Sequence, residues 1–142
     1  MDFLTFFQQN IFYFGALIVL AVLIVGNEIN ISRSKRFLIS VLDTLKASNN
    51  EEAIIFDLRA KKQFSEGHIP TAKHLEMKDL ESKFTQLDSY RGKKVIFYCD
   101  SGARSSQACI NLRKSHKEDN LFYSINGGID AWIDQKLPVT KR

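Results

Sequence analysis

The sequence is poor in the residues from which metal sites and disulfide scaffolds are built. Its 142 residues include two cysteines, Cys99 and Cys109, and three histidines. One cysteine follows an apolar run and the other falls within the next helical pattern, and this placement disfavours a disulfide between them. No spacing of cysteine and histidine matches a zinc site, so we expect no bound metal. Two free thiols also indicate a reducing compartment.

Patterns that bind nucleotides or nucleic acids are missing as well. The glycine pair Gly127-Gly128 lacks the G-x-G-x-x-G spacing of a dinucleotide-binding loop. The net charge is only +4, and basic residues such as Lys61 and Lys62 are interspersed with acidic ones, which is typical of a solvated surface. There is neither an internal repeat nor a low-complexity tract, and the length suits one domain with a real core. We therefore expect no cofactor and no nucleic-acid partner.

Charged residues are absent from a long stretch near the N-terminus, residues 3–27. Its strictly apolar part, residues 11–25, is short for a membrane span of about 20 residues, and the neutral residues before it supply the missing length. We predict a transmembrane anchor in residues 1–36, with the span at about 6–26 and a basic linker after it. A cleaved signal peptide is the alternative, but it needs positive charge before the apolar run, where only Asp2 is present.

The basic residues Arg33, Lys35 and Arg36 directly follow this apolar stretch. The positive-inside rule places such residues in the cytoplasm. We therefore expect a single-pass protein with its N-terminus outside and residues 37–142 in the cytoplasm, which agrees with the free thiols.

The remaining chain alternates short apolar runs with helical patterns. Runs typical of buried or extended strands occupy residues 37–39, 53–56, 75–77, 95–98 and 121–125. Helical patterns occupy residues 41–46, 61–66, 80–87, 105–114 and 129–135. Ser40 and Asp43 form a capping pair at the first of these helices. This alternation predicts an α/β fold in one domain, with a central, mainly parallel sheet and helices on both faces.

The loop after the apolar run 95–98 has the composition of a reactive site. It begins at Cys99, and a loop between a strand and a helix is where α/β proteins place chemistry. Its successive N–H groups can form an anion-binding nest that favours the nucleophilic thiolate. Gly102 supplies backbone freedom and Arg104 a fixed positive charge. The alternative is a buried cysteine that only ends a strand.

Three separate motifs resemble those of the rhodanese family of sulfurtransferase domains. They are Asp57-Leu58-Arg59 with Phe64-x-x-Gly67-His68-Ile69-Pro70-x-Ala72, the loop Cys99–Ser105, and Gly127-Gly128-Ile129-Asp130-Ala131-Trp132 with Leu137-Pro138-Val139. They occur in the family's order, and the resemblance covers roughly residues 37–139. The whole chain resembles bacterial single-domain rhodanese-like proteins with one N-terminal transmembrane helix, which implies the bacterial inner membrane as its location.

The resemblance implies the rhodanese fold and persulfide chemistry at Cys99. This catalytic cysteine would take a sulfane sulfur from thiosulfate or a persulfide and pass it to cyanide or a thiol. The resemblance assigns the active-site loop and substrate binding to Asp100, Ser101, Gly102, Ala103, Arg104 and Ser105. Arg104 would guide an anionic donor, and Ser105 would either bond the loop or cap the next helix. Structural support is expected from Asp57, Arg59, His68, Gly127, Gly128 and Trp132.

Asp100 departs from the family pattern, in which an arginine or a neutral residue often follows the cysteine. A carboxylate there repels anionic donors, so we expect a persulfide held by a protein or a small thiol to be the better donor. Phosphatases of the Cys-x5-Arg type are not matched, because only four residues separate Cys99 from Arg104. Two other interpretations stay open: a non-enzymatic, membrane-tethered interaction module that docks a partner through the active face or residues 80–87, and a redox sensor that uses Cys99 and Cys109.

Overall fold

The computed structural model describes residues 2–85, 90, 92–116 and 121–141. The chain divides into two compact units, Met1–Arg36 and Phe37–Arg142. The second unit contains every motif discussed above except the apolar stretch.

The N-terminal unit consists of two helices, α1 (Phe3–Gln9) and α2 (Ile11–Lys35). The part Ile11–Ile29 has a mean hydropathy of 2.1 and is long enough to cross a membrane, a property that signal sequences share. The two helices are separated at Asn10, whose side-chain amide donates to the carbonyl oxygen of Phe6 at 2.8 Å. This candidate span overlaps most of the span expected at about 6–26, whose bounds stay a prediction.

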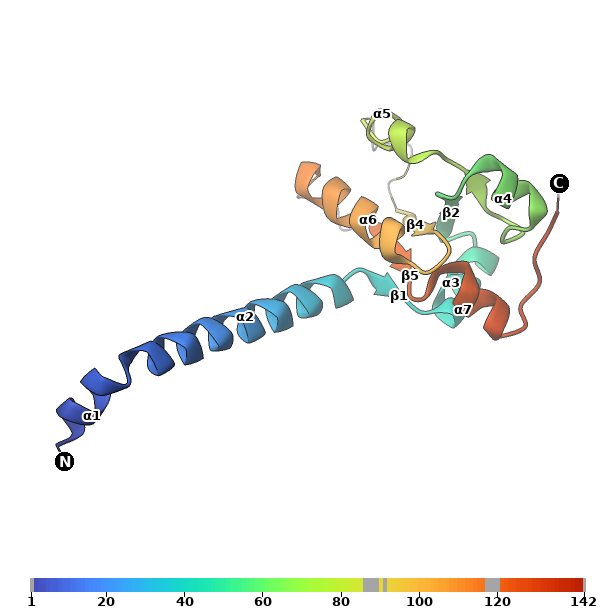
Figure 1. Cartoon of the computed structure of the whole chain (residues 1–142). Helices are drawn as coiled ribbons and strands as arrows, with labels where there is room; N and C mark the ends of the chain where they lie inside the picture. The colour runs from blue at the N-terminus through green and yellow to red at the C-terminus, as the bar shows by residue number, and fades with distance from the viewer. Residues whose placement is uncertain (1, 86–89, 91, 117–120, 142) are drawn as a thin grey trace. The chain divides into compact units, whose positions relative to one another are not determined.

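Five parallel strands form the sheet of the second unit, in the order β1-β5-β4-β2-β3 (Figure 1). The strands are β1 (Leu38–Ile39), β2 (Ala53–Asp57), β3 (Lys73–His74), β4 (Lys94–Tyr98) and β5 (Phe122–Ile125). The other elements are α3 (Val41–Asn49), α4 (Lys61–Glu66), the 3-10 turn η1 (Met77–Asp79), α5 (Leu80–Lys83), α6 (Ala103–Ser115) and α7 (Gly128–Asp134). The expected α/β fold with a central parallel sheet is confirmed.

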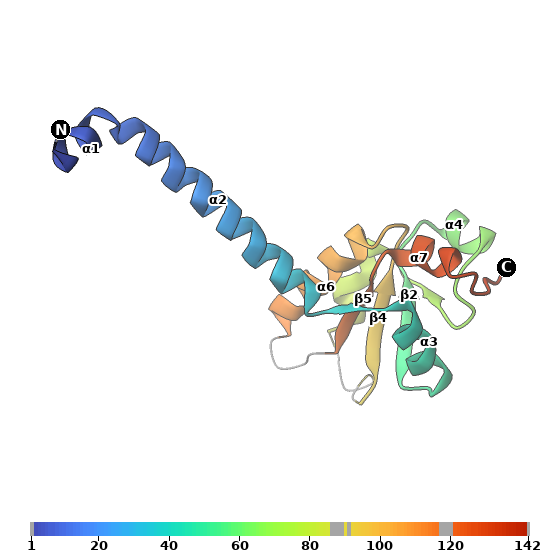
Figure 2. The same cartoon turned by 90° about the horizontal axis from the view of Figure 1, so that it is seen from below.

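Alternate side chains of the central strand β4 enter two separate cores. Val95 and Phe97 pack in the core that α5 and α6 contribute to, whereas Ile96 and Tyr98 pack with side chains from α3, α4 and α7. Figure 2 shows α6 on one side of the sheet and α3 on the other. Because side chains alternate along a strand, a strand covered on both faces must be apolar throughout. The uninterrupted apolar run of β4 is the result.

Two expected elements differ in extent. The strand expected at 75–77 is β3, which ends at His74, although the Leu75 N–H still donates to the Asp57 carbonyl oxygen at 3.0 Å. Met77 then begins η1. Of the helix expected over 80–87, the structure describes α5, which ends at Lys83 with Phe84 as its C-cap, and Leu87 lies outside the described residues.

The carboxyl ends of β2, β4 and β5 lie side by side at one edge of the sheet. The register pairs Asp57 of β2 with Tyr98 of β4, and Phe97 of β4 with Ser124 of β5. Each of the three sequence motifs follows or ends one of these strands, so the fold brings all three to the same edge. In open parallel sheets this edge is where ligands bind.

Candidate active site

Cys99 follows the last residue of β4 at this edge and is almost completely buried, with 1% of its surface exposed. The backbone N–H of Gly102 donates to its sulfur at 3.1 Å. The hydroxyl of Ser105 lies 3.7 Å from the same sulfur. A thiolate or persulfide at this position would therefore have the backbone donor of Gly102 directed at it, with the Ser105 hydroxyl close by.

Gly102 gives the loop its tight form. Its φ of +94° lies in the left-handed region, and it forms the N-cap of α6. A β-carbon there would lie 3.1 Å from the carbonyl oxygen of Ile125 at the end of β5. The loop thus needs glycine both for its backbone conformation and for its contact with the neighbouring strand.

The glycine pair after β5 supports the other side of the loop. The N–H of Ile129 donates to the Cys99 carbonyl oxygen at 2.9 Å, and the N–H of Asp130 donates to the Asp100 carbonyl oxygen at 3.2 Å. A β-carbon on Gly128, whose φ is +61°, would overlap both of these carbonyl oxygens. The start of α7 therefore holds the carbonyl groups of Cys99 and Asp100 in place.

Ser105 bonds the loop rather than capping the helix. Its hydroxyl donates to the Gly102 carbonyl oxygen at 3.1 Å and lies 2.8 Å from the hydroxyl of Ser124 in β5. The N-cap position belongs to Gly102. Of the two roles expected for Ser105, the structure therefore shows the loop contact.

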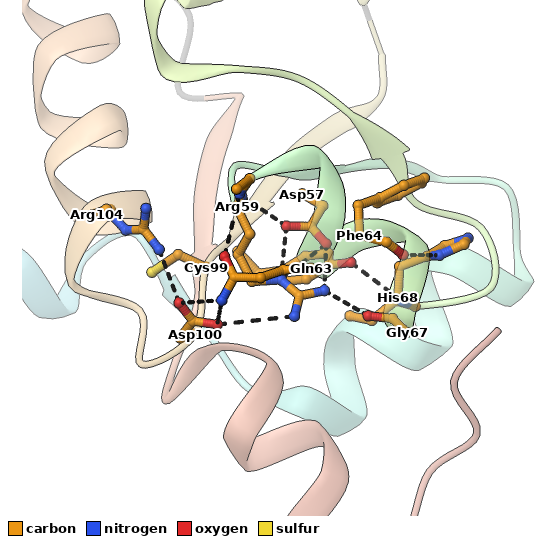
Figure 3. Close-up of polar contacts among 12 residues, drawn as sticks. Asp57, Arg59, Gln63, Phe64, Gly67, His68, Cys99, Asp100 and Arg104 are labelled. Atoms are coloured by element: carbon orange, nitrogen blue, oxygen red, sulfur yellow. Dashed lines mark hydrogen bonds and ion pairs between the residues drawn. The ribbon is translucent and has the colours of Figure 1, made fainter. Parts of the chain in front are cut away.

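Asp100 and Arg104 pair with each other. The guanidinium of Arg104 lies 2.9 Å from the Asp100 carboxylate, and their side chains are 52% and 41% exposed. Gln63 of α4 donates to the same carboxylate at 3.2 Å, and Arg59 lies 3.9 Å from it (Figure 3). The expectation that Arg104 guides an anionic donor stays a prediction, and in the structure its guanidinium pairs with Asp100. The reason is its position four residues after Asp100, at the start of a helix.

Asp57 and Arg59 form a buried ion pair behind the loop. The Arg59 guanidinium lies 2.7 Å from the Asp57 carboxylate and also donates to the Gly67 carbonyl oxygen at 2.6 Å. Burial alone would lower the pKa of Arg59, but the hydrogen bond and charge of Asp57 outweigh it and raise this pKa. The guanidinium also lies over the ring of Tyr98, 5.7 Å from its centroid. This arrangement ties β2 to α4 and to the end of β4.

His68 and Trp132 anchor the C-terminal segment. The His68 N–H donates to the Thr140 carbonyl oxygen at 2.9 Å, and its ring stacks on Phe64 with 3.8 Å between centroids. The indole N–H of Trp132 donates to the Pro138 carbonyl oxygen at 3.0 Å. Both side chains are buried and pack within the fold.

The profile of the rhodanese-like domain family matches residues 40–135. The chain belongs to the rhodanese family. It is 31% identical over 94 residues to a sulfurtransferase of Allochromatium vinosum. This alignment covers 66% of this chain and 84% of the relative. The chain is 30% identical over 94 residues to the thiosulfate sulfurtransferase GlpE of Pseudoalteromonas translucida, covering 66% of this chain and 86% of that one.

Solved structures share the fold of this rhodanese domain. A human single-domain sulfurtransferase matches with a TM-score of 0.58 at 22% identity, covering 70% of this chain and 96% of the human chain. A rhodanese-related protein of Thermoplasma volcanium matches with a TM-score of 0.60 at 23% identity. The match covers 73% of this chain and 97% of the Thermoplasma chain. Together with the sequence relatives, the family supports a sulfurtransferase type of function.

Two residues of the rhodanese site were missed in the sequence. Gln63 reaches Asp100 only because α4 lies beside the cysteine loop, and no local sequence pattern predicts that contact. Ser124, whose hydroxyl contacts Ser105, carries a signal that could have been used. It is a polar residue in an otherwise apolar buried strand, and such residues need a hydrogen-bond partner.

A cleft of about 360 Å³ opens beside Arg104. Its lining combines the apolar side chains of Leu58 and Met77 with the charged side chains of Arg59, Lys61, Glu76, Lys78 and Arg104. A cleft of this size and character, next to the cysteine loop of a rhodanese domain, suits a small organic molecule with polar groups.

The second cysteine belongs to the core. Cys109 of α6 is buried in the same core as Val95 and Phe97 of β4, and burial raises the pKa of its thiol to about 12. A thiol with so high a pKa is a poor nucleophile at neutral pH, which disfavours a redox pair with Cys99. Among the described residues there is no group of three His, Cys, Asp or Glu side chains that could hold a metal.

Proposed function

We propose that this rhodanese domain is a sulfurtransferase that carries a sulfane sulfur as a persulfide on Cys99, and that α2 anchors it in the bacterial inner membrane. The reaction class is supported by the family and by relatives named as sulfurtransferases. The choice of Cys99 is supported by one observation above all. Its sulfur accepts the Gly102 N–H at 3.1 Å at the carboxyl end of the central strand.

The transfer takes place in two displacements. The Cys99 thiolate attacks the outer sulfur of the donor, an S–S bond forms to Sγ, and the S–S bond of the donor breaks with its electron pair on the leaving group. The acceptor, a thiolate or cyanide, then attacks the outer sulfur of the persulfide and releases the Cys99 thiolate. A covalent carrier of this kind divides one difficult transfer into two easier steps.

The loop stabilises negative charge without an acid or base side chain. The Gly102 N–H donates to the sulfur, while the N–H groups of Ile129 and Asp130 bind the carbonyl oxygens of Cys99 and Asp100. Fixed backbone dipoles in a site of low water content stabilise developing charge effectively. The buried hydroxyl of Ser105 lies within reach of the same sulfur.

The membrane anchor and its orientation are part of this proposal. The helix Ile11–Ile29 has the length and composition of a span, and the basic residues that follow it favour a cytoplasmic catalytic domain. In that compartment Cys99 would be maintained as a thiol or persulfide, since disulfides are rare there.

The decisive experiment is intact mass spectrometry of the full chain in detergent after exposure to glutathione persulfide or thiosulfate. We expect a gain of about 32 Da, one sulfur atom, which is lost when cyanide or a thiol is added, as a covalent carrier requires. Cys99→Ser should show no gain, and Cys109→Ala should gain sulfur as the wild type does.

Absence of the adduct from a folded protein with a free Cys99 thiol would contradict the proposal. In that case a tethered interaction module with the rhodanese fold becomes the better interpretation. Sulfur on Cys109 instead of Cys99 would contradict the residue assignment alone.

A further inference from the structure

Donor groups from three elements converge on the Asp100 carboxylate. Arg104 of α6 lies 2.9 Å from one oxygen, Gln63 of α4 lies 3.2 Å from the other, and Arg59 of the β2–α4 loop lies 3.9 Å from that second oxygen. Figure 3 shows Arg104 and Arg59 on opposite sides of this carboxylate. Two guanidinium groups and an amide are a donor set that suits a sulfonate or another small oxyanion equally well.

We propose that Asp100 occupies, from within the chain, the anion site that Arg59, Gln63 and Arg104 form, and that it thereby selects persulfides of organic thiols over thiosulfate as sulfur donors. The inference rests on the proposed function. According to this inference, Asp100 determines the choice of sulfur donor, because it contacts the side chains that would otherwise bind thiosulfate.

The backbone of Asp100 is held by the start of α7, so movement of the carboxylate together with its loop would break these contacts. The Asp100 carbonyl oxygen accepts the Asp130 N–H at 3.2 Å, and Gly128 packs directly against this peptide. The SO₃ group of thiosulfate could therefore enter the site only if the Asp100 side chain rotates away, or if it binds beside this like charge. Either alternative disfavours thiosulfate.

An organic persulfide has no need of this anion site. The cleft of about 360 Å³ next to Arg104 offers space for the organic part of such a donor. Its lining includes the apolar side chains of Leu58 and Met77, the ammonium group of Lys61, and the ion pair of Lys78 with Glu76. Thiosulfate has no organic part and would leave this cleft empty.

The charge balance of the two reactions agrees with this selection. With thiosulfate, the thiolate and the dianion become a persulfide anion and sulfite, so three negative charges gather next to Asp100. With a protonated organic persulfide, R–S–SH, the thiolate becomes the Cys99 persulfide and R–S⁻ leaves, so one negative charge is present throughout. The S–S bond of the donor breaks as the new one forms, and no further oxidant or reductant is consumed.

The test compares kcat/KM for thiosulfate with kcat/KM for glutathione persulfide in the full chain. Asp100→Ser should raise the ratio of the two values by about tenfold, the expected effect of removing one like charge from an ion-pair site. Asp134→Asn is the matched control, because it removes the same charge from an exposed position on α7 and should leave the ratio unchanged. Arg104→Gln added to Asp100→Ser should cancel the gain.

A binding measurement tests the same site without turnover. By calorimetry, Asp100→Ser should bind sulfite about tenfold more tightly than the wild type or Asp134→Asn. Equal sulfite affinity and an unchanged donor ratio in Asp100→Ser would overturn the inference, as would an equal shift in Asp134→Asn. If no variant accepts sulfur at Cys99 from either donor, the proposed function fails, and the sulfite measurement still decides whether Asp100 fills an anion site.

Discussion

Gly128 is a residue at which one added β-carbon would disturb the cysteine loop directly. We expect Gly128→Ala to destabilise the protein through its positive φ, at about 1–2 kcal/mol, and through overlap with the loop carbonyls, at about 1–3 kcal/mol more. Sulfur transfer should fall by about tenfold or more, since the overlap moves the backbone on which the Gly102 N–H depends. Urea denaturation and steady-state kinetics measure the two effects.

Gly92→Ala is a control for the backbone strain. Gly92 has a φ of +78°, but a β-carbon there meets open space. Gly92→Ala should therefore lose only the stability that the positive φ accounts for, and should transfer sulfur at the normal rate. If Gly92→Ala and Gly128→Ala lose the same stability and activity, the contact between Gly128 and the cysteine loop does not contribute to sulfur transfer.

Cys109 makes the stability of the folded protein depend on pH in the alkaline range. Burial raises the pKa of its thiol from 9.0 to about 12 in the folded state. The folded protein therefore holds this proton more tightly than the unfolded chain, so the contribution to stability is intact below pH 9 and is lost as the pH rises towards 12. Between pH 9 and 10 the wild type should lose about 1 kcal/mol through this thiol.

The measurement is urea denaturation at pH 8, 9 and 10, comparing wild type with Cys109→Ala. The pKa of Tyr98 is also raised by burial, but a tyrosine begins to contribute only above its ordinary value of 10.0. Cys109→Ala should be less stable at pH 8 because of the lost packing, and should decline less steeply from pH 9 to 10. Parallel curves for the two proteins would show that Cys109 does not titrate as expected.

At the scale of elements, the Asp57–Arg59 pair connects β2 to α4. Asp57→Asn leaves the guanidinium of Arg59, which is 8% exposed, without its charged partner, and should cost about 3 kcal/mol in the free energy of unfolding. Glu76→Gln is a matched control, because Glu76 and Lys78 are also two residues apart and lie 2.8 Å apart, but on the surface. The control should change stability little, and equal losses in both variants would contradict the role of burial.

Most elements that carry the site could be predicted from the sequence. The buried runs 53–56 and 95–98 are strands, and Ser40 caps α3 with Asp43 as its sequence indicates, because both signals depend on neighbouring residues alone. The motifs also predicted the loop and its glycine turn. What the motifs could not predict was how Gly128 supports the loop, because this support runs between segments almost 30 residues apart.

The polar contacts of the loop were harder to predict. The pairing of Asp100 with Arg104 could have been inferred from their spacing of four residues at a helix start. The contribution of Gln63 depends on how α4 packs beside the loop, which no local pattern encodes. Residues that act across elements in this way need the tertiary structure.

At the scale of the whole molecule, the compartment and the chemistry depend on each other. A cytoplasmic domain would keep Cys99 and Cys109 reduced, whereas export would expose the same thiols to oxidation. The fate of the apolar helix Ile11–Ile29 therefore bears on the sulfur chemistry as well as on location.

We expect the protein expressed in bacteria to remain in the membrane after alkaline carbonate extraction, with the 16.3 kDa mass of the uncleaved chain. A signal sequence would instead yield a shorter chain in the soluble fraction. In spheroplasts, the domain Phe37–Arg142 should resist added protease until the membrane is opened, because the basic residues after the helix retain it inside. Digestion in intact spheroplasts would place Cys99 outside the cell, where thiol acceptors and organic persulfides are readily oxidised, and would contradict the orientation on which the proposed donor class depends.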